Sequence, residues 1–578
     1  MMMSQLVSAN DPDGSRPTPP QSARSGMHPA KLAVGAAVLL WASFPPAEWN
    51  WLAWFALAPL FLLVGSDRPA RPLYLGSWLG GFAFWLLAVH WVWWTDPSAW
   101  LGWIVMAGVL SLWWPGFLFL ARYGTRKLDL PLMIAAPVAW VALEQLRAHI
   151  LGGFPWYYLA HGQYRMLYLT QIADFSGALG LSFVMAVVNA FWVDLLTRPL
   201  FRAGASGGSA WSRMTRDFRV RSAVVLVMVA GTVGYGAFRV HTARFREGPR
   251  LGMLQSSEVQ RYNSHETKDR PTLLALYESL MLRATRANPA PDLLVWPETA
   301  YPYSYADIDP KLDPKALETQ VKEIDPDFIG DDWRKIERRT KDLFARWMAN
   351  PGIPMMVGSS TYHFRPEGYE RYNSAVLLQP GGLAPQFYHK IRLVPFGEYV
   401  PLVDVFPWLM ALTPYRGQKV HFLGSGKDPA WFRFGRLKMA AAICFEDTLP
   451  AIVRRFFSEV TDGHEPDILV NLSNDGWFHQ TSEHEMHLAI SVFRCIENRV
   501  PLARAVNTGI SAVVDGNGRI VASLGKLKEG VLIASVPLDD RVALYSRWGD
   551  WVGLSCLAAT IGMIPLGYAR PRLRRARA

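Results

Sequence analysis

Three residues that could perform covalent chemistry lie at the ends of apolar or aromatic runs of the chain. Glu298 ends the run LLVWPE, Lys390 lies in FYHKIRLVPFGEYVP, and Cys444 ends AAAIC. A cysteine attacks a carbonyl group only as a thiolate, so it needs a base or a positive charge nearby. Glu298 could take the thiol proton, and Lys390 could offset negative charge on the attacked oxygen. These residue types together indicate nucleophilic acyl chemistry.

The carboxyl groups close to Cys444 require a positive charge nearby to offset their effect on the thiol. Glu446 and Asp447 follow the cysteine almost directly, and carboxylates beside a thiol make the thiol less acidic. A lysine would have to compensate for them, which is a second reason to expect Lys390 near Cys444. Glu398 lies eight residues after Lys390. It is either a further site residue or a structural partner of that lysine.

The elements that position these residues belong to an α/β pattern. Between residues 250 and 540, short β-rich runs alternate with amphipathic helical patterns. Strands that are apolar throughout are typical of a sheet that helices cover. Loops at strand ends usually carry the reactive groups of such sheets. The charged, proline-broken stretch 303–334 interrupts the pattern, and we predict that it is a surface insertion.

Apolar runs on either side of this domain predict a membrane part. A membrane-spanning helix needs about 20 mostly apolar residues, and hydrophobic residues make up 51% of the 578-residue chain. The predicted spans are 31–48, 51–66, 73–94, 99–121, 131–147, 180–197, 222–240 and 551–568. The sequence therefore predicts eight transmembrane helices and one water-soluble α/β domain.

Domain boundaries follow from these runs. Residues 1–30 are polar and rich in proline and serine, which is typical of a disordered tail rather than a signal peptide. The remaining predicted parts are a membrane domain with seven spans at 31–240, a catalytic domain at 241–548, an eighth transmembrane helix at 549–570 and a basic tail at 571–578.

Positive charge gathers on one side of the predicted spans. With a cytoplasmic N-terminus, every inside segment carries Arg or Lys, whereas the outside turns PPAEWN and TDPS carry neither. The positive-inside rule then places the catalytic domain on the periplasmic side of a bacterial inner membrane. Much of the net charge of +11 is thus an orientation signal, and we expect no nucleic-acid partner.

Segment 148–179 is unlike an ordinary loop. It is aromatic and glycine-rich, too interrupted to span a membrane and too apolar to be fully solvated. We predict a re-entrant or interfacial segment with Trp156, Tyr157 and Tyr158 at the level of the lipid headgroups. An aromatic belt that only anchors helices and a role in substrate entry both fit this pattern.

Histidines and glutamates gather after the cysteine motif. They are His479, Glu483, His484, Glu485 and His487. The zinc pattern HExxH needs histidines four positions apart, whereas His484 and His487 are three apart. We therefore predict no metal site.

Several other polar and sulfur-containing residues are predicted to be structural. Asn471, Asn474 and Asp475 of NLSNDGWF are expected to shape a turn beside the site. Three cysteines in the chain are too few for a disulfide framework. We expect Cys495 in the core and Cys556 facing lipid.

The order of these motifs resembles one known family. WPE, HK with VPFGEYVP, and ICFE resemble the Glu-Lys-Cys triad of the nitrilase, or carbon–nitrogen hydrolase, superfamily. The apolar runs together with VPFGEYVP and NLSNDGWF narrow the resemblance to the apolipoprotein N-acyltransferase family, and the matching stretches include GGFPW at 152–156 and RYNS at 371–374. The resemblance covers nearly the whole chain from about residue 31. It implies a nitrilase-like αββα sandwich held by the eight transmembrane helices.

The resemblance also implies an activity and a set of roles. The family moves an acyl chain from the sn-1 position of a phospholipid to the α-amino group of an N-terminal S-diacylglyceryl-cysteine, through a thioester on the catalytic cysteine. Carried over, Glu298 is the general base, Lys390 stabilises the oxyanion and Cys444 is the nucleophile. No cofactor is implied. The partners are a phosphatidylethanolamine-type donor and a diacylglyceryl apolipoprotein, and nothing requires more than a monomer.

The resemblance implies roles for further site residues, and at one position this chain differs from the family. Glu398 matches another essential glutamate of the family, and Phe445 and Glu446 match the residues that follow its cysteine. The family has a tryptophan on a mobile arm after the first soluble strand. This chain has QRYNSHETKD there, with Tyr262 in place of the tryptophan.

Two other functions use the same features. A membrane-tethered amidase or nitrilase would employ the triad with water as the second nucleophile, although eight spans exceed what a tether requires. A non-catalytic lipoprotein-binding factor on an inactive enzyme scaffold is the third candidate, and the intact triad argues against it.

Overall fold

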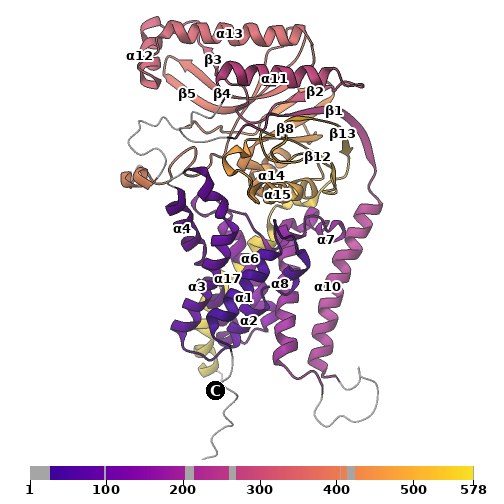
Figure 1. Cartoon of the computed structure of the whole chain (residues 1–578). Coiled ribbons are helices and arrows are strands. Elements are labelled where there is room, and N and C mark those ends of the chain that lie inside the picture. The colour runs from indigo at the N-terminus through magenta and orange to yellow at the C-terminus, as the bar shows by residue number, and fades with distance from the viewer. Residues whose placement is uncertain are drawn as a thin grey trace, which may run out of the picture.

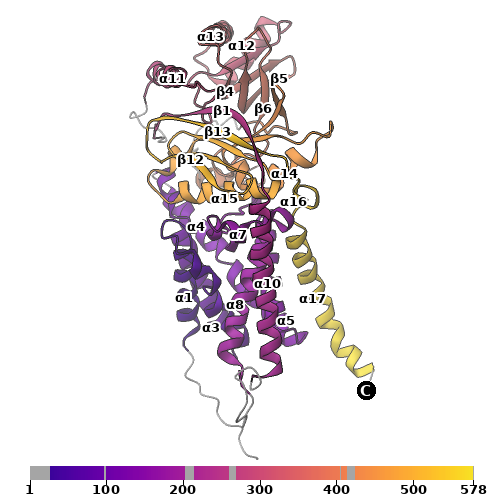
Figure 2. The ribbon, with the colours of Figure 1, turned by 90° about the vertical axis from the view of Figure 1, so that its right-hand side faces the viewer.

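The protein consists of a helical bundle and an α/β domain stacked on it (Figure 1). The computed structural model describes residues 27–96, 99–201, 214–259, 268–403, 405–412 and 423–576. The first part of the chain and the last helix form the bundle, and the residues between them form the α/β domain (Figures 1 and 2). Most of the predicted tail 1–30, and the predicted arm residue Tyr262, lie outside the described residues.

The bundle contains four helices, within the described residues, that are long and apolar enough to cross a membrane. They are α4 (Ala99–Leu110) with α5 (Trp113–Lys127), α8 (Ala173–Thr197), α10 (Arg216–His241) and the first part of α17 (Trp551–Ala576). Shorter helices complete the bundle: α1 (Pro29–Ala42), α2 (Ala58–Leu62), α3 (Ala70–Ala88) and α6 (Leu132–Arg147). The structure thus gives crossing-length helices at four of the eight predicted spans, and the full set of eight remains a prediction.

The predicted span 51–66 is not one helix. It is divided into η1 (Asn50–Trp54), α2 and η2 (Leu63–Gly65). Leu60 and Phe61 within it are fully buried, and α2 packs against α1 and α8. Backbone outside a continuous helix is tolerated at membrane depth where protein surrounds it. The apolar run therefore reflects burial in protein.

The aromatic segment after α6 lies inside the protein. Short helical turns form it: η4 (Ile150–Gly152), η5 (Leu159–Gln163) and α7 (Leu167–Thr170). Trp156, Tyr157 and Tyr158 are at most 5% exposed and so are enclosed by protein, while their position at the level of the lipid headgroups stays a prediction. They pack in the core, where the Trp156 ring is 5.7 Å from the ring of His487. Cys556 is also buried rather than lipid-facing, because α17 packs against α6.

Two β-sheets pack together in the α/β domain. One has the order β13 (Gly530–Asp539), β1 (Phe245–Gln255), β2 (Leu293–Val295), β4 (Met355–Arg365), β5 (Gly368–Leu378), β6 (Gln386–His389), with β3 (Tyr305–Ile308) paired to β4. The other has the order β12 (Ile520–Leu524), β11 (Ser511–Val514), β10 (Leu502–Val506), β9 (Ile468–Ser473), β8 (Leu437–Ile443), β7 (Trp431–Phe434). Strands β2, β9 and β10 are buried throughout, as parallel strands covered on both faces should be.

Helices cover the outer face of each sheet, which gives the predicted αββα order (Figure 2). α11 (Arg270–Thr285) and α13 (Gly330–Ala349) lie on the side away from the bundle. α14 (Pro450–Ser458) and α15 (Glu483–Asn498) lie between the second sheet and the bundle. Every residue of α15 except Glu485 is buried, because this helix also packs against α8. The α/β domain and the bundle therefore share a core.

The predicted insertion 303–334 is ordered. It contains β3, α12 (Pro314–Ile324) and the start of α13, and it lies at the end of the α/β domain away from the bundle (Figure 1). Leu317, Val321 and Trp333 form a small apolar cluster with Tyr362 and Phe364 of β4. That cluster explains why a charged stretch folds here.

One carboxylate joins α8 to the α/β domain. Arg499, directly after α15, is fully buried and donates from Nε and Nη2 to Asp174 Oδ2 at 2.9 and 2.6 Å. Arg239 on α10 lies 2.7 Å from the same oxygen, and the Tyr235 hydroxyl donates to Asp174 Oδ1 at 2.6 Å. Asp174 thus balances two guanidinium groups from different parts of the chain.

Removing this carboxylate should destabilise the whole molecule. Asp174→Ala leaves the buried Arg499 guanidinium without its counter-ion, which should lower the free energy of unfolding by about 3 kcal/mol. Thermal unfolding of the purified chain in detergent measures the loss. Asp67→Ala, which breaks an exposed ion pair with Arg126, is the control and should change stability by less than about 0.5 kcal/mol. Equal effects of the two variants would contradict the assigned role of Asp174.

Candidate active site

Three strand ends bring the predicted triad together. Glu298 follows β2, Lys390 follows β6, and Cys444 follows β8 as the first residue of η7 (Cys444–Thr448). The first two strands belong to one sheet and β8 to the other. The site therefore lies where the two sheets meet. Its geometry depends on how the sheets pack.

The ammonium group of Lys390 is shared by two carboxylates. Lys390 is fully buried, and its Nζ lies 3.1 Å from Glu298 Oε1 and 2.9 Å from Glu398 Oε1. Burial alone would lower the pKa of Lys390, but the two carboxylates outweigh burial and raise that pKa well above its usual value. The lysine is therefore a fixed cation, and Glu398 is one of its two direct partners.

Further donors hold both carboxylates in place. The Asn373 side chain, on β5, donates from Nδ2 to Glu298 Oε1 at 2.7 Å and to Glu398 Oε1 at 3.2 Å. The backbone N–H of Asn474 donates to Glu298 Oε2 at 2.9 Å. The backbone N–H of Val394 donates to Glu398 Oε2 at 2.7 Å. Both carboxylates thus have directed partners, as buried charges require.

Cys444 lies beside this cluster in an unusual backbone conformation. Its φ of 51° falls in the left-handed region that few non-glycine residues adopt and that is concentrated at functional sites. The side chain is half-buried. Burial raises the pKa of the thiol well above its usual value, Glu298 raises that pKa further and Lys390 opposes them. The thiol is therefore protonated at rest.

The carboxyl group of Glu446 accepts hydrogen bonds that hold backbone N–H groups in place. Its Oε1 accepts hydrogen bonds from the Tyr388 hydroxyl at 2.8 Å and from the N–H groups of Ile391 and Arg392 at 2.6 and 3.0 Å. Its Oε2 accepts from the N–H of Ile443 at 2.7 Å. Burial raises the pKa of Glu446 to about 7. This carboxyl group therefore ties the turn that follows Lys390 to the turn that holds Cys444.

Asp447 has its own set of partners. Its oxygens lie 2.7 Å from Nε2 of His487, 2.6 Å from the Ser491 hydroxyl and 3.1 Å from Nη1 of Arg504. Burial would raise the pKa of Asp447, but its contacts with His487 and Arg504 outweigh burial and lower that pKa. The acidic residues that follow Cys444 are therefore both committed to partners other than the thiol.

The turn of the bundle around Gly152 contacts the loop that follows Lys390. Nε of Arg392 donates to the carbonyl of Gly152 at 3.2 Å. Gly152 has a φ of 97°, and a Cβ added to it would meet Cγ of Pro395 at 2.9 Å. Phe445 is half-buried against the main core. The GGFPW motif thus approaches the catalytic loop closely, and glycine makes that approach feasible.

Sequence reasoning missed three hydrogen-bond partners of the predicted site residues. Asn373 bridges Glu298 and Glu398, Tyr388 donates to Glu446, and the Asn474 N–H fixes Glu298. The polar motif RYNS within an otherwise apolar strand was the available signal for Asn373. A backbone donor leaves no signal of this kind, because any residue type could supply it.

Two domain families and several named proteins match this chain. Residues 36–191 match the apolipoprotein N-acyltransferase N-terminal domain, and residues 255–545 match carbon–nitrogen hydrolase. A protein of Geobacter metallireducens named apolipoprotein N-acyltransferase is 33% identical over 552 residues, which cover 93% of this chain and 95% of that protein. One of the same name from Rhodopirellula baltica is 28% identical over 564 residues, covering 91% and 95%. A solved amidase from Nesterenkonia sp. is 21% identical and covers 53% of this chain and 98% of its own, with a TM-score of 0.34.

The opposite effects of Glu298 and Lys390 on the thiol give a testable pH dependence. Alkylation by iodoacetamide follows the thiolate. Its pH profile at Cys444 should move to lower pH in Glu298→Gln, which removes a charge that raises the thiol pKa, and to higher pH in Lys390→Met. Peptide mass spectrometry measures the reaction, with the fully buried Cys495 as an internal control that stays unmodified. Profiles that do not move would mean that neither charge acts on the thiol.

Proposed function

The chain belongs to the apolipoprotein N-acyltransferase family, and from that premise we propose its donor, acceptor and mechanism. The enzyme takes an acyl chain from the sn-1 position of a phospholipid of the phosphatidylethanolamine type. It transfers the chain to the α-amino group of an N-terminal S-diacylglyceryl-cysteine, through a thioester on Cys444. The observation that carries this proposal is the buried Lys390 ammonium held between Glu298 and Glu398, with the turn of Cys444 tied to the turn after Lys390 through Glu446.

In the first half-reaction, Cys444 attacks the ester carbonyl of the phospholipid. The thiol is protonated at rest, so Glu298 accepts its proton as the sulfur–carbon bond forms. Negative charge moves to the carbonyl oxygen, where the Lys390 ammonium stabilises it. The carbon–oxygen ester bond then breaks, and the departing lysophospholipid oxygen takes the proton from Glu298. A thioester remains on Cys444.

In the second half-reaction, the α-amino group of the diacylglyceryl-cysteine attacks the thioester carbonyl. Glu298 accepts a proton from the attacking amine, and Lys390 again stabilises the oxyanion. The carbon–sulfur bond breaks, and the sulfur recovers a proton from Glu298. The products are an N-acylated amide and the free thiol of Cys444. Water in place of the amine would make the enzyme a hydrolase.

Proton transfer within the cluster leaves its total charge unchanged. At rest, Glu298 and Glu398 are negative and Lys390 is positive. When the proton passes from Cys444 to Glu298, the negative charge moves from oxygen to sulfur and stays near the same ammonium group. Creating a new buried charge is costly. The cluster avoids that cost because it only relocates a charge.

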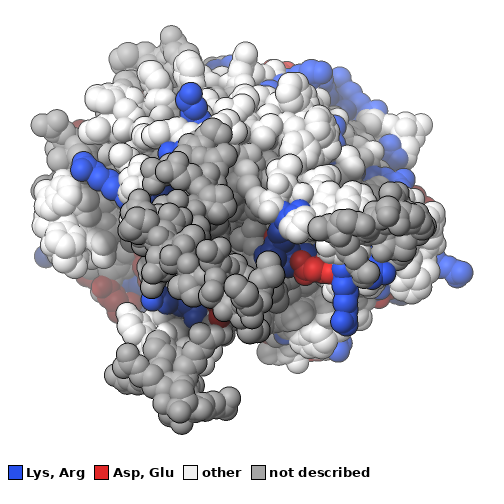
Figure 3. All heavy atoms as spheres, turned by 90° about the horizontal axis from the view of Figure 1, so that it is seen from below, with Lys and Arg blue, Asp and Glu red and all other residues white. Residues whose placement is uncertain are grey.

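Both proposed substrates are anchored in lipid, so the bundle would hold the active site at the membrane surface where they lie. We place the α/β domain on the periplasmic side of a bacterial inner membrane, with the free end of the bundle in the cytoplasm. Figure 3 views that free end, where Lys and Arg outnumber Asp and Glu among the coloured side chains. The positive-inside rule supports this orientation. The enzyme then works as a monomer at the outer leaflet.

Replacing the nucleophile should abolish the acyl-enzyme. Wild-type protein incubated with acyl-labelled phosphatidylethanolamine should gain one acyl mass on the Cys444 peptide, and hydroxylamine should remove it, because hydroxylamine cleaves thioesters. Cys444→Ala should show neither the adduct nor transfer to a diacylglyceryl peptide. Cys556→Ala, a cysteine buried in the bundle, is the matched control and should keep both. Release of free fatty acid without peptide acylation would identify a hydrolase instead, and peptide binding without turnover would identify a binding factor.

The bridging amide should affect the rate of thioester formation. Asn373→Ala removes the side-chain donor to both carboxylates, and losing a hydrogen bond to a charged group costs about 1.5 to 3 kcal/mol. We expect single-turnover acylation to slow by roughly 10- to 100-fold. Ser374→Ala is the control, since its hydroxyl contacts Thr361 and His389 and neither carboxylate. Equal rates in the two variants would contradict a positioning role for Asn373.

A further inference from the structure

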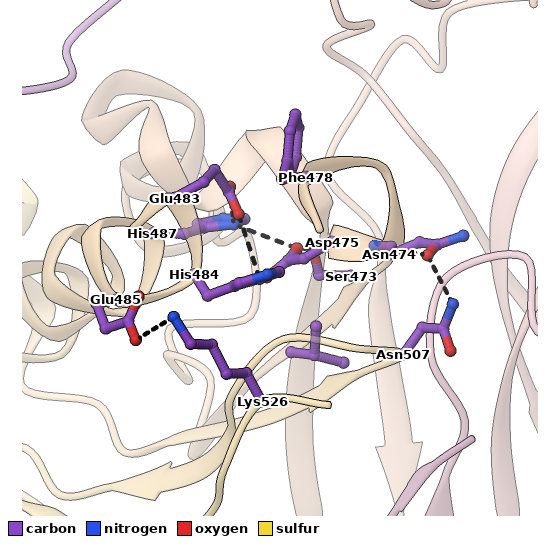
Figure 4. A network of polar contacts seen from close by, with 12 residues as sticks. Ser473, Asn474, Asp475, Phe478, Glu483, His484, Glu485, His487, Asn507 and Lys526 are labelled. Carbon is purple, nitrogen blue, oxygen red and sulfur yellow. Dashed lines mark hydrogen bonds and ion pairs between the residues drawn. The ribbon is translucent and has the colours of Figure 1, made fainter. Parts of the chain in front are cut away.

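A second cluster of ionisable groups lies next to the triad and takes no part in the proposed reaction. Asp475 in η8 (Asp475–Phe478) and Glu483 and His487 on α15 bring their ligand-type atoms within 4.8 Å of one another. All three side chains are at most 2% exposed. Figure 4 shows the two carboxylates and the imidazole of His487 turned toward one another, with His484 beside them.

The imidazole of His487 is oriented for metal binding. Its Nε2 lies 2.7 Å from Asp447 Oδ1, so this nitrogen carries a proton and donates it to the carboxylate. Histidine ligands of metals commonly donate their other ring nitrogen to a carboxylate in this way. In the neutral ring, Nδ1 then offers a lone pair, and it lies 3.5 Å from Asp475 Oδ1 and 3.4 Å from Glu483 Oε1.

Two buried atoms of the cluster lack a hydrogen bond. Neither Nδ1 of His487 nor Oε2 of Glu483 has a hydrogen-bond partner in the part of the chain that the structure describes, although Oε2 of Glu483 lies 3.5 Å from Nδ1 of His484 in an ion-pair contact. Leaving buried polar atoms unpaired is costly. The spacing also fits an ion, because two ligands of a tetrahedral zinc with bonds of about 2.0 Å lie about 3.3 Å apart.

The charges around the cluster are not balanced. Asp447, Asp475 and Glu483 supply three carboxylates, and Arg504 supplies one buried guanidinium, 3.1 and 3.0 Å from the two aspartates. Two negative charges remain if the imidazoles of His484 and His487 are neutral. One divalent cation would neutralise them. Two extra protons on the imidazoles are the alternative, since both rings face the same carboxylates.

We propose that Asp475, Glu483 and His487 bind a divalent transition-metal ion, with zinc as the best fit. Two carboxylates and one imidazole suit zinc, and three protein ligands leave a fourth position for water. The histidine spacing predicted no metal site, because the HExxH pattern considers only two histidines on one helix. In the structure, one proposed ligand lies in η8 and the other two lie on α15.

The role of the ion would be structural. Asn474, next to Asp475, supplies the N–H that fixes Glu298, whereas Glu483 and His487 lie on the helix that packs against α8. An ion between them fastens the turn that holds the catalytic base to the helix that faces the bundle. This inference concerns a site separate from the triad, so loss of acyl transfer does not bear on it.

Metal content of the full chain in detergent tests the proposal. Elemental analysis of wild-type protein incubated with Zn²⁺ and then dialysed should find about one ion per chain, as three protein ligands require. Glu483→Gln keeps the side-chain shape but removes a charged ligand and should lose the ion. Glu485→Gln is the matched control, because Glu485 points to Lys526 on the other side of the helix at 2.7 Å, and it should keep the ion.

Two further measurements remain valid even if Glu483→Gln folds poorly. Wild-type protein loaded with Co²⁺ should show the visible absorption bands of a tetrahedral site. Zn²⁺ added to chelator-treated wild type should raise Tm by about 2 °C at a hundredfold excess over Kd. Wild-type protein without bound zinc, or without either cobalt bands or a Tm shift, overturns the proposal. The two imidazoles would then carry protons instead.

Discussion

The buried ammonium group of Lys390 is the interaction on which the rest of the site depends. An isolated ammonium would lose its charge at that depth, so two carboxylates must contact it. Each carboxylate in turn needs fixed donors, which Asn373 and two backbone N–H groups supply. These groups come from both sheets and from the loops at their ends. The packing of the two sheets therefore determines the chemistry.

The same requirement explains the acidic residues that follow Cys444. A solvated carboxylate next to the thiol would only make it a weaker nucleophile. Glu446 instead holds backbone N–H groups on both sides of the site, and Asp447 pairs with His487 and Arg504. Both carboxyl groups position the left-handed turn at Cys444. Backbone strain at that turn needs such surrounding contacts to persist.

The residues that gather at the candidate site were predicted from this sequence more completely than the burial of the apolar segments. Glu298, Lys390 and Cys444 could be singled out because few residue types perform acyl chemistry and strand ends are where they act. Asn373 was missed because an amide on a strand can be structural or functional, and only its position distinguishes the two. Run 51–66 was predicted to be a membrane-spanning helix, and the burial of the aromatic residues near Trp156 inside protein was not predicted, yet both pack in protein. Hydropathy records removal from water, and a protein interior removes a side chain from water as effectively as a bilayer does.

Shared burial between the bundle and the α/β domain has a consequence for catalysis. α15 is buried on both sides, Asp174 is paired with Arg499, and Gly152 contacts the loop that begins at Lys390. A movement of the aromatic segment relative to α8 would therefore disturb the turn that carries Lys390 and Glu398. Under the proposed function, lipid-anchored substrates approach along the bundle and react in the other domain. Contacts that fix the two domains relative to each other would then keep an ester bond at the membrane surface within reach of Cys444.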